Sequence, residues 1–183
     1  ATTGIDADDA SPETLDEAYK VLGKEFENLA DRSNIRIDPK FFDDVESIAA
    51  NYSRRLPTDI KPVFKSYVDD IMEIKKFTNQ NPEIDGQTYR RIGTDLRKAA
   101  RATKDSELET ALTGLVNSLD DLMTRNVAPE IAAGWREARN QYRNLKIIDK
   151  AMQGGTQAER TAGDIPLSGL RGAVRAADPN TYS

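Results

Sequence analysis

Four pairs of adjacent carboxylates are the first candidates for chemistry in this sequence: Asp8-Asp9, Asp43-Asp44, Asp69-Asp70 and Asp120-Asp121. Glycoside hydrolysis needs two carboxyl groups roughly 5 to 10 Å apart across a sugar-binding cleft. Adjacent residues on a helix point about 100° apart, so the two members of such a pair do not converge. We therefore predict that all four pairs lie on solvated helix faces, and we predict no catalytic residue.

Metal and cofactor motifs are the next candidates. The acidic run at residues 6–9 is too short for a calcium-binding loop. The glycines at 154–155 and at 169 and 172 follow no strand and lack the spacing of a dinucleotide-binding loop. Because the chain has no cysteine and no histidine, it also lacks a thiol nucleophile, the commonest general base and the commonest zinc ligand. We predict no metal, no cofactor and no small-molecule substrate, and hence no enzyme.

Arginines at helical spacing are the strongest binding candidates. Residues that recur every three or four positions share one face of a helix, and such a basic stripe could follow the phosphates of a nucleic acid. Glu137 and Asp149 interleave with one of the stripes, and the net charge of the chain is -5, so pairing with an acidic helix explains the stripe equally well. The candidate partner-contact residues are Arg136, Arg139, Arg143, Arg90, Arg97 and Arg101.

The elements that must position these residues are helices. Apolar residues recur every three or four positions almost throughout the chain, and strand-type alternation is nearly absent. With 38% hydrophobic and 31% charged residues, the composition is typical of a bundle with a thin core and a large surface. The predicted helices cover residues 12–32, 39–56, 59–77, 86–102, 106–125 and 129–153, and either Asp105 or Ser106 is predicted to cap the fifth.

Local signals refine these elements. Ser11-Pro12 and Asp38-Pro39 each combine a good N-cap with a proline in the first helical turn. The stretch 35–37 reads as extended, and Ile84 is predicted to pair with Ile35 or Ile37. Trp135 and Tyr142 are seven residues apart on the apolar seam of the last long helix, where they either pack in the core or form a partner-binding face.

The predicted fold class is all-α: an antiparallel bundle of five to six amphipathic helices plus a short C-terminal helix. The bundle covers residues 11–153, after a flexible acidic lead-in at 1–10. A linker at 154–164 precedes a short docking helix at 165–178, which carries Leu167, Leu170 and Val174, and residues 179–183 form a tail. No apolar run approaches the roughly 20 residues of a membrane span, and we predict no signal peptide.

Charge is distributed unevenly along the chain. Residues 1–31 contain nine acidic residues but only Lys20 and Lys24, whereas eight basic residues face five acidic ones from residue 134 onward. This polarity indicates head-to-tail contacts between copies or a charged partner, although a solvated helix surface would show it too.

One stretch resembles a known family. The run from Trp135 to Ile148 is similar to a stretch common in large virion-associated proteins of tailed bacteriophages and prophages. Four other segments also resemble that family: Ile37-Asp38-Pro39, the run from Gly86 to Ile92, the run from Asp120 to Met123, and Ile165 to Leu170. The resemblance covers about residues 10 to 178, and only the first stretch is specific.

The resemblance implies a helical segment of a longer internal-virion, DNA-ejection or tail-associated protein. Such proteins travel with the genome and help to carry it across the host envelope, and their partners are other virion proteins or copies of themselves. Some also carry a separate peptidoglycan-cutting domain, which the resemblance does not place here. We thus expect a non-enzymatic assembly module in the phage particle, delivered on infection to the host envelope. The alternatives are a module that contacts nucleic acid weakly and a helical adaptor that binds a protein outside a phage.

Overall fold

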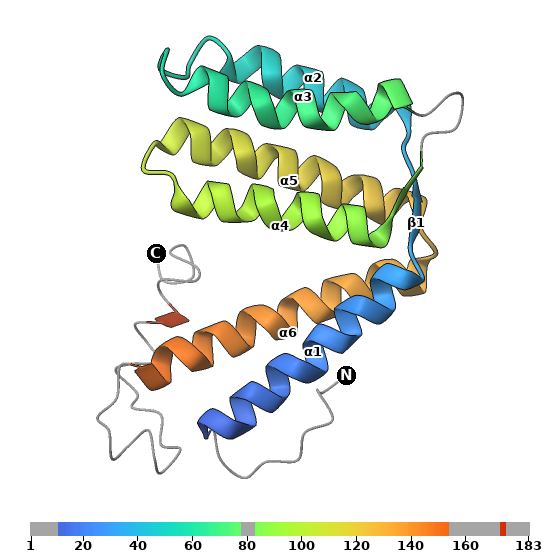
Figure 1. The fold of residues 1–183 in the computed structure, drawn as a ribbon, viewed down its shortest axis with the longest axis vertical. Coiled ribbons are helices and arrows are strands. Elements are labelled where there is room, and N and C mark those ends of the chain that lie inside the picture. Colours follow the sequence, from blue (N-terminus) through green and yellow to red (C-terminus); the bar gives the residue numbers. More distant parts are fainter. Residues whose placement is uncertain (1–10, 78–82, 154–172, 175–183) are drawn as a thin grey trace. The chain divides into compact units, whose positions relative to one another are not determined.

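The computed structural model describes residues 11–77, 83–153 and 173–174. Six long helices and two short strands make up these residues (Figure 1), which confirms the all-α class. In chain order the elements are α1 (Pro12–Asp31), β1 (Asn34–Arg36), α2 (Pro39–Tyr52), α3 (Lys61–Phe77), β2 (Glu83–Asp85), α4 (Gly86–Ala102), α5 (Ser106–Asn126) and α6 (Pro129–Gln153).

Side-chain caps fix the starts of four helices. Each cap oxygen accepts a hydrogen bond from a backbone N–H of the first turn, which has no partner inside the helix. The caps are Ser11 on α1, Asp38 on α2, Asp85 on α4 and Asp105 on α5, with N···O distances of 3.2, 2.9, 2.7 and 2.8 Å. The predicted starts at residues 12, 39, 86 and 106 are therefore confirmed.

The segment between α2 and α3 differs from the prediction. Helix α2 ends at Tyr52 rather than at Leu56, and α3 begins at Lys61 rather than at residue 59. Leu56 is nevertheless buried, with 3% of its surface exposed, so the apolar period continues into a turn that follows the helix. Residues 53–55 form turns, in which the Leu56 N–H still donates to the Tyr52 carbonyl at 2.9 Å, and Pro57 follows this segment.

The described residues fall into two compact units, where we had predicted a single bundle over residues 11–153. The first, here called the paired-helix unit, contains α1 up to Asn28 and α6 from Ala133 onward. The second, the four-helix unit, runs from Leu29 to Ala132 and contains α2 to α5 with both strands. Each unit is described separately.

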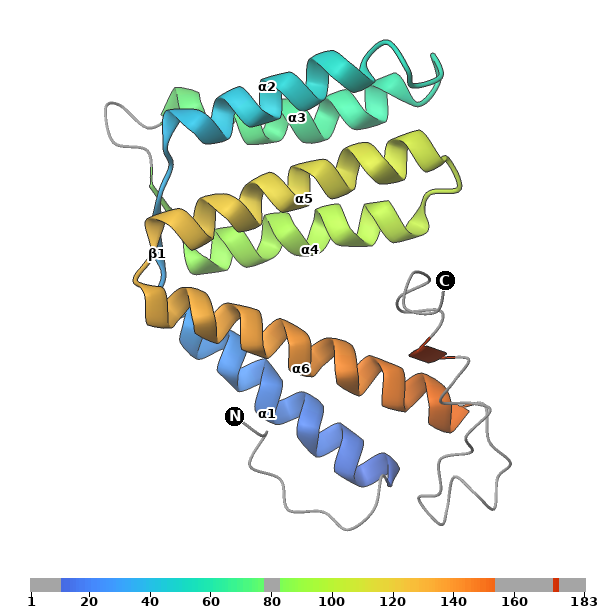
Figure 2. The same ribbon diagram turned by 180° about the vertical axis from the view of Figure 1, so that it is seen from behind.

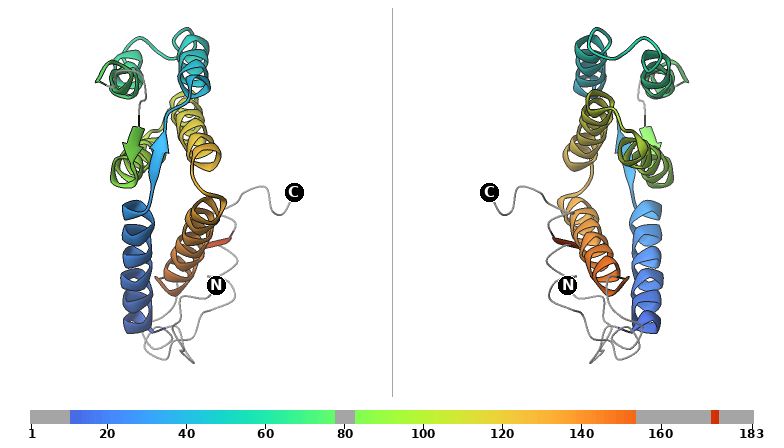
Figure 3. Two further views of the ribbon diagram at one scale, coloured as in Figure 1. Left: turned by 90° about the vertical axis from the view of Figure 1, so that its right-hand side faces the viewer. Right: turned by 90° about the vertical axis from the view of Figure 1, so that its left-hand side faces the viewer.

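The four-helix unit is an up-and-down bundle centred on α5. Helix α5 packs against both α2 and α4 (Figure 2), and α3 lies on the same side as α4 when the helices are seen end-on (Figure 3). The connections at one end pair as an antiparallel ribbon, with Ile35 of β1 opposite Ile84 of β2, as predicted. The largest fully buried side chains of this unit include Phe41, Val45, Tyr89, Leu96, Leu112, Leu115 and Leu119.

In the paired-helix unit, α1 and α6 run antiparallel and meet through aromatic rings. The Phe26 ring lies 5.8 Å from that of Trp135, and the Tyr19 ring lies 5.9 Å from that of Tyr142. Trp135 is 2% exposed and belongs to the core, whereas Tyr142 is 39% exposed at the edge of the contact. The predicted lead-in, linker, docking helix and tail lie outside the described residues, apart from residues 173–174, which are helical.

Candidate interaction surfaces

Arg97 braces two helices of the four-helix unit. Its Nη2 lies 2.9 and 2.7 Å from the two carboxylate oxygens of Asp120, and the Tyr89 hydroxyl donates to the same carboxylate at 2.8 Å. Arg97 and Tyr89 are on α4 and Asp120 is on α5, so the three side chains hold the helices together. Asp120 was predicted on a solvated face; instead it is half-buried as the acceptor of this network.

Gly93 lies beside the Arg97 guanidinium. A Cβ atom at Gly93 would lie 2.6 Å from Nη1 of Arg97. The guanidinium of Arg97, which is one turn further along α4, therefore lies where a side chain at residue 93 would be. Gly93 is itself buried on the face of α4 that packs toward α5. The residue pattern of α4 alone does not indicate this contact, because the acceptor of Arg97 is Asp120, 23 residues away on another helix.

The remaining candidate arginines are divided between the two units. Arg101 donates from Nε to the carbonyl of Arg97, one turn earlier on α4, at 3.0 Å. Arg90 is half-buried on the same helix. Arg90, Arg97 and Arg101 belong to the four-helix unit, whereas the other three candidates belong to the paired-helix unit.

On α6, Arg136 and Arg143 are exposed, while Arg139 is half-buried over the Trp135 ring at 5.9 Å from its centroid. Arg143 donates to Asn140 at 3.4 Å, which leaves it on the outer surface. These positions are consistent with the predicted outward stripe.

The two acidic residues that interleave with this stripe in the sequence are turned away from it. Glu137 is half-buried and accepts a hydrogen bond from Gln141 at 2.9 Å. Asp149 is also half-buried and accepts hydrogen bonds from Tyr19 at 3.2 Å and from Gln153 at 2.9 Å. The outer stripe of α6 is therefore more uniformly basic than the sequence alone indicates.

Lys146 joins the two helices of this unit. Its Nζ lies 4.9 Å from the centroid of the Tyr19 ring and 5.7 Å from that of Tyr142, within the range of cation–π attraction. The same Nζ is 3.8 Å from Asp149. Burial, followed by the nearby Asp149 carboxylate, raises the pKa of Tyr19 well above its usual range, so this phenol stays protonated as a donor. The cluster is a structural contact between α1 and α6.

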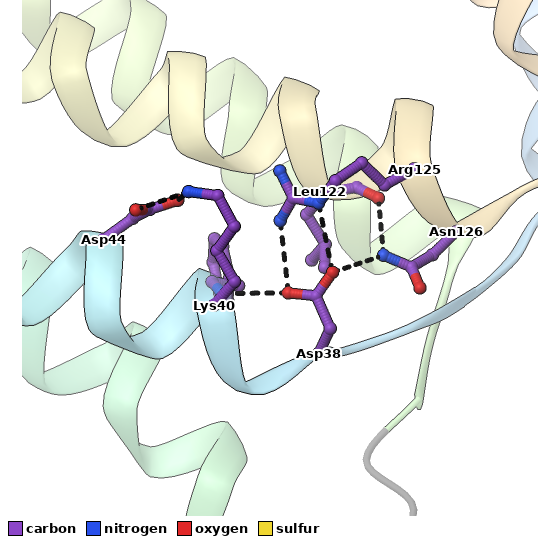
Figure 4. Close-up of polar contacts among 7 residues, drawn as sticks. Asp38, Lys40, Asp44, Leu122, Arg125 and Asn126 are labelled. Atoms are coloured by element: carbon purple, nitrogen blue, oxygen red, sulfur yellow. Dashed lines mark hydrogen bonds and ion pairs between the residues drawn. The ribbon is translucent and has the colours of Figure 1, made fainter.

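Asp38 joins the start of α2 to the end of α5 through several hydrogen bonds (Figure 4). Arg125 donates from Nε and Nη2 to its two oxygens, both at 3.1 Å, and Asn126 donates to Oδ2 at 2.8 Å. Since Asp38 also caps α2, one carboxylate starts that helix and ties it to the end of α5. The sequence indicates the cap but not the ion pair with Arg125, because the two residues are 87 positions apart.

The electrostatics of Asp38 follow from these donors. Partial burial acts to raise the pKa of the carboxyl group, but hydrogen bonds from Arg125, Asn126 and the Phe41 backbone outweigh it, and the pKa is lowered. The pKa of Arg125 is raised in return by the same hydrogen bonds. Asp38 is therefore a charged structural anchor in the neutral pH range.

Two grooves flank α3. The groove between α2 and α3 has a volume of about 580 Å³ and a mostly apolar lining that includes Ala49, Pro62, Phe64 and Val68. The lysines at its rim are Lys61 and Lys65, and the latter forms an ion pair with Asp69. On the other side, a crevice of about 350 Å³ between α3 and α4 has a mixed lining that includes Asp70, Arg91, Ile74 and Ile92.

Searches for a metal site and for a membrane span give no candidate within the described residues. In residues 11–77, 83–153 and 173–174, no three acidic side chains gather in a way that could hold a metal ion. None of the helices in these same ranges combines the length and the apolar character that a membrane crossing requires.

Comparison with known proteins yields no relative: no family model, no curated protein and no solved structure matches this chain.

Proposed function

We propose that this chain is a non-enzymatic assembly module of a phage virion protein, which takes part in genome ejection or in tail assembly. The sequence support for the phage setting is the resemblance of the stretch from Trp135 to Ile148 to large virion-associated proteins. In the structure this stretch combines buried residues that pack the paired-helix unit, such as Trp135 and Ala138, with outward arginines. A module of this kind would act through contacts of its surface with other virion proteins or with copies of itself.

The observation that carries the assembly proposal is the apolar groove between α2 and α3. Concave surfaces with a mostly apolar lining are preferred binding sites in proteins. Val63, near the start of α3, is 49% exposed and adds another large apolar side chain to the surface of that helix. We infer that the surface around α3 contacts another virion protein.

Internal bracing gives the module the rigidity that an assembly role requires. Asp38 and Asp120 each tie α5 to a neighbouring helix through charge-assisted hydrogen bonds, which are stronger than neutral ones. Within the described residues every buried polar side-chain atom has a hydrogen-bond partner. Such a module presents fixed surfaces, and a rigid binding surface loses less conformational entropy on association than a flexible one.

The experiment that tests the virion setting is peptide mass spectrometry on purified particles of the phage or induced prophage that encodes the chain. We expect tryptic peptides from both units, at a handful to a few dozen copies per particle. Complete absence, with the other structural proteins well covered, would contradict the proposal and favour an adaptor that acts outside a phage.

A nucleic-acid-contacting module is the second candidate, and the uniformly basic outer stripe of α6 favours it. Phosphate contacts weaken steeply as salt increases because binding releases counterions. Electrophoretic mobility of a 30-base-pair duplex at 20 to 300 mM NaCl tests this candidate. Binding that weakens steeply as the salt concentration rises, and that Arg136→Glu abolishes, would support this candidate. No binding at 20 mM NaCl would exclude it.

A further inference from the structure

The outer face of α6 carries charge of one sign. Between Ala133 and Gln153 the exposed charged side chains are all basic, namely Arg136, Arg143, Lys146 and Lys150. The acidic residues of this part of the helix, Glu137 and Asp149, are half-buried and hydrogen-bonded at its flanks. Lys146 lies over the Tyr19 and Tyr142 rings and 3.8 Å from Asp149, so a neighbouring molecule that approaches this face meets about three positive charges.

The outer face of α1 carries the opposite charge. Its exposed acidic residues within the paired-helix unit are Glu13, Asp16, Glu17, Glu25 and Glu27, against the two exposed lysines Lys20 and Lys24. Five negative and two positive charges leave about three net negative units on this face. The two helices of one unit thus present outer faces of opposite sign.

The two charged faces are also matched in length. Glu13 and Glu27 are 14 residues apart on α1, and Arg136 and Lys150 are 14 residues apart on α6. At a rise of about 1.5 Å per residue, both charged stretches are about 21 Å long. Two such helices laid side by side could bring the ends of both charged stretches into register.

We propose that the outer face of α6 in one copy docks against the outer face of α1 in a second copy of this chain. The inference rests on the proposed assembly function and names its partner. The sides of α1 and α6 that face each other are already occupied, since Tyr19 and Phe26 pack against Tyr142 and Trp135. The outer faces are what each copy can offer to its neighbour.

Charge complementarity favours a second copy over nucleic acid as the occupant. A duplex presents phosphates on every side, so it would be attracted to α6 but repelled by the acidic face of α1 in the same unit. Neighbouring copies of the chain satisfy both faces, one copy at α6 and another at α1. Because the two docking faces differ, the contact is heterologous, and repetition of it produces a closed ring or an open filament rather than a two-fold dimer.

Charge reversal on each face separately tests the docking. The basic-face variant combines Arg136→Glu with Arg143→Glu, and the acidic-face variant combines Glu17→Lys with Glu27→Lys; all four side chains are exposed. Sedimentation velocity at 20 mM NaCl should show concentration-dependent oligomers of the unaltered chain. Each variant alone should stay monomeric, and 500 mM NaCl should dissociate the unaltered oligomers, since salt screens surface charges.

An equimolar mixture of the two variants tests directly whether the α6 face of one copy binds the α1 face of another. Each variant retains one native face, so the mixture should form a 1:1 dimer and nothing larger. A double variant in the four-helix unit, Lys98→Glu with Lys104→Glu, changes the net charge at exposed positions as much as the basic-face variant does and should associate like the unaltered chain. Thermal unfolding of every variant shows whether the helices remain folded.

The inference is overturned if the unaltered chain stays monomeric at 20 mM NaCl and several hundred micromolar protein. It is equally overturned if either charge-reversed variant associates like the unaltered chain, or if the mixture stays monomeric. If a monomeric chain binds a 30-base-pair duplex through Arg136 and Arg143, the partner of the basic face is nucleic acid and not a second copy. A monomeric chain whose peptides are found in particles would leave the proposed function intact and remove only the second copy as partner.

Discussion

Asp38 and Arg125 form a two-point ion pair in which Nε and Nη2 of the arginine each donate to a different carboxylate oxygen at 3.1 Å. The same carboxylate accepts the Phe41 N–H at 2.9 Å and so caps α2. One side chain therefore sets where α2 begins and fixes that end of the helix to the end of α5. The stability of the four-helix unit should depend on it in two separable ways.

Asp38→Ala should lower the free energy of unfolding by about 1 to 2 kcal/mol, because it removes both the cap and the ion pair. Asp38→Asn should cost less, about 0.5 to 1 kcal/mol, because asparagine caps helices as well as aspartate does but carries no charge. Urea unfolding followed by circular dichroism measures both values.

The matched control is Asp44→Ala, which removes an exposed i,i+4 ion pair with Lys40 on the same helix. We expect a change within about 0.5 kcal/mol for this variant. Equal destabilisation by Asp38→Asn and Asp38→Ala would show that the cap contributes nothing measurable.

The lowered pKa of Asp38 gives the stability a defined dependence on pH. A carboxyl group whose pKa is lower in the folded chain stabilises it fully above the unfolded value of about 3.9, and this contribution is lost as the pH falls through the folded value. The stability difference between the unaltered chain and Asp38→Asn should therefore be constant from about pH 5 to 7 and shrink toward pH 2. A difference that grows as the pH falls would contradict the assignment.

Gly86 and Gly23 should respond in opposite directions to alanine. A Cβ atom at Gly86 would lie 2.3 Å from the carbonyl oxygen of Ala30, a backbone atom that cannot move aside without shifting the chain. Gly86→Ala should therefore destabilise the protein by about 1 to 3 kcal/mol. A Cβ at Gly23 meets nothing within 4 Å, so Gly23→Ala should stabilise α1 by about 0.5 to 1 kcal/mol.

Thermal unfolding of the two glycine variants in parallel provides the comparison, and each serves as the control for the other. Stabilisation by Gly86→Ala would mean that the chain at Ala30 does not approach α4 as closely as described.

Arg97 should matter for stability and not for binding. Arg97→Ala removes two hydrogen bonds to Asp120 and should cost about 1 to 2 kcal/mol in urea unfolding. Lys98→Ala, at the exposed neighbouring position, should change the stability by less than about 0.5 kcal/mol. If Arg97→Ala unfolds like Lys98→Ala, the bridge contributes no stability.

Local signals in the sequence were sufficient for most of the fold. Caps and first-turn prolines depend only on neighbouring residues, so Ser11-Pro12 and Asp38-Pro39 mark helix starts that the structure confirms. The pairing of Ile35 with Ile84 follows from two short apolar stretches between helices. The end of α2 was harder to predict because Leu56 continues the apolar period into a buried turn.

Contacts between distant residues could not be predicted in the same way. The partner of Arg97 is set by how α4 packs on α5, and an acid at residue 120 looks like any other surface acid in a helix pattern. For the same reason the sequence placed Glu137 and Asp149 within the basic stripe, whereas helix packing turns both toward its flanks. The division into two units also depends on tertiary contacts that a common helical period does not reveal.

Cross-linking mass spectrometry of intact, purified particles tests the assembly role most directly. Lys61 and Lys65, at the rim of the α2–α3 groove, should form cross-links to another virion protein. Lys146 and Lys150 should form cross-links to Lys20 or Lys24, with isotope-mixed particles showing that these links join different copies. Particles in which the peptides of this chain are absent, or carry only links within one copy despite full coverage, would contradict an assembly module.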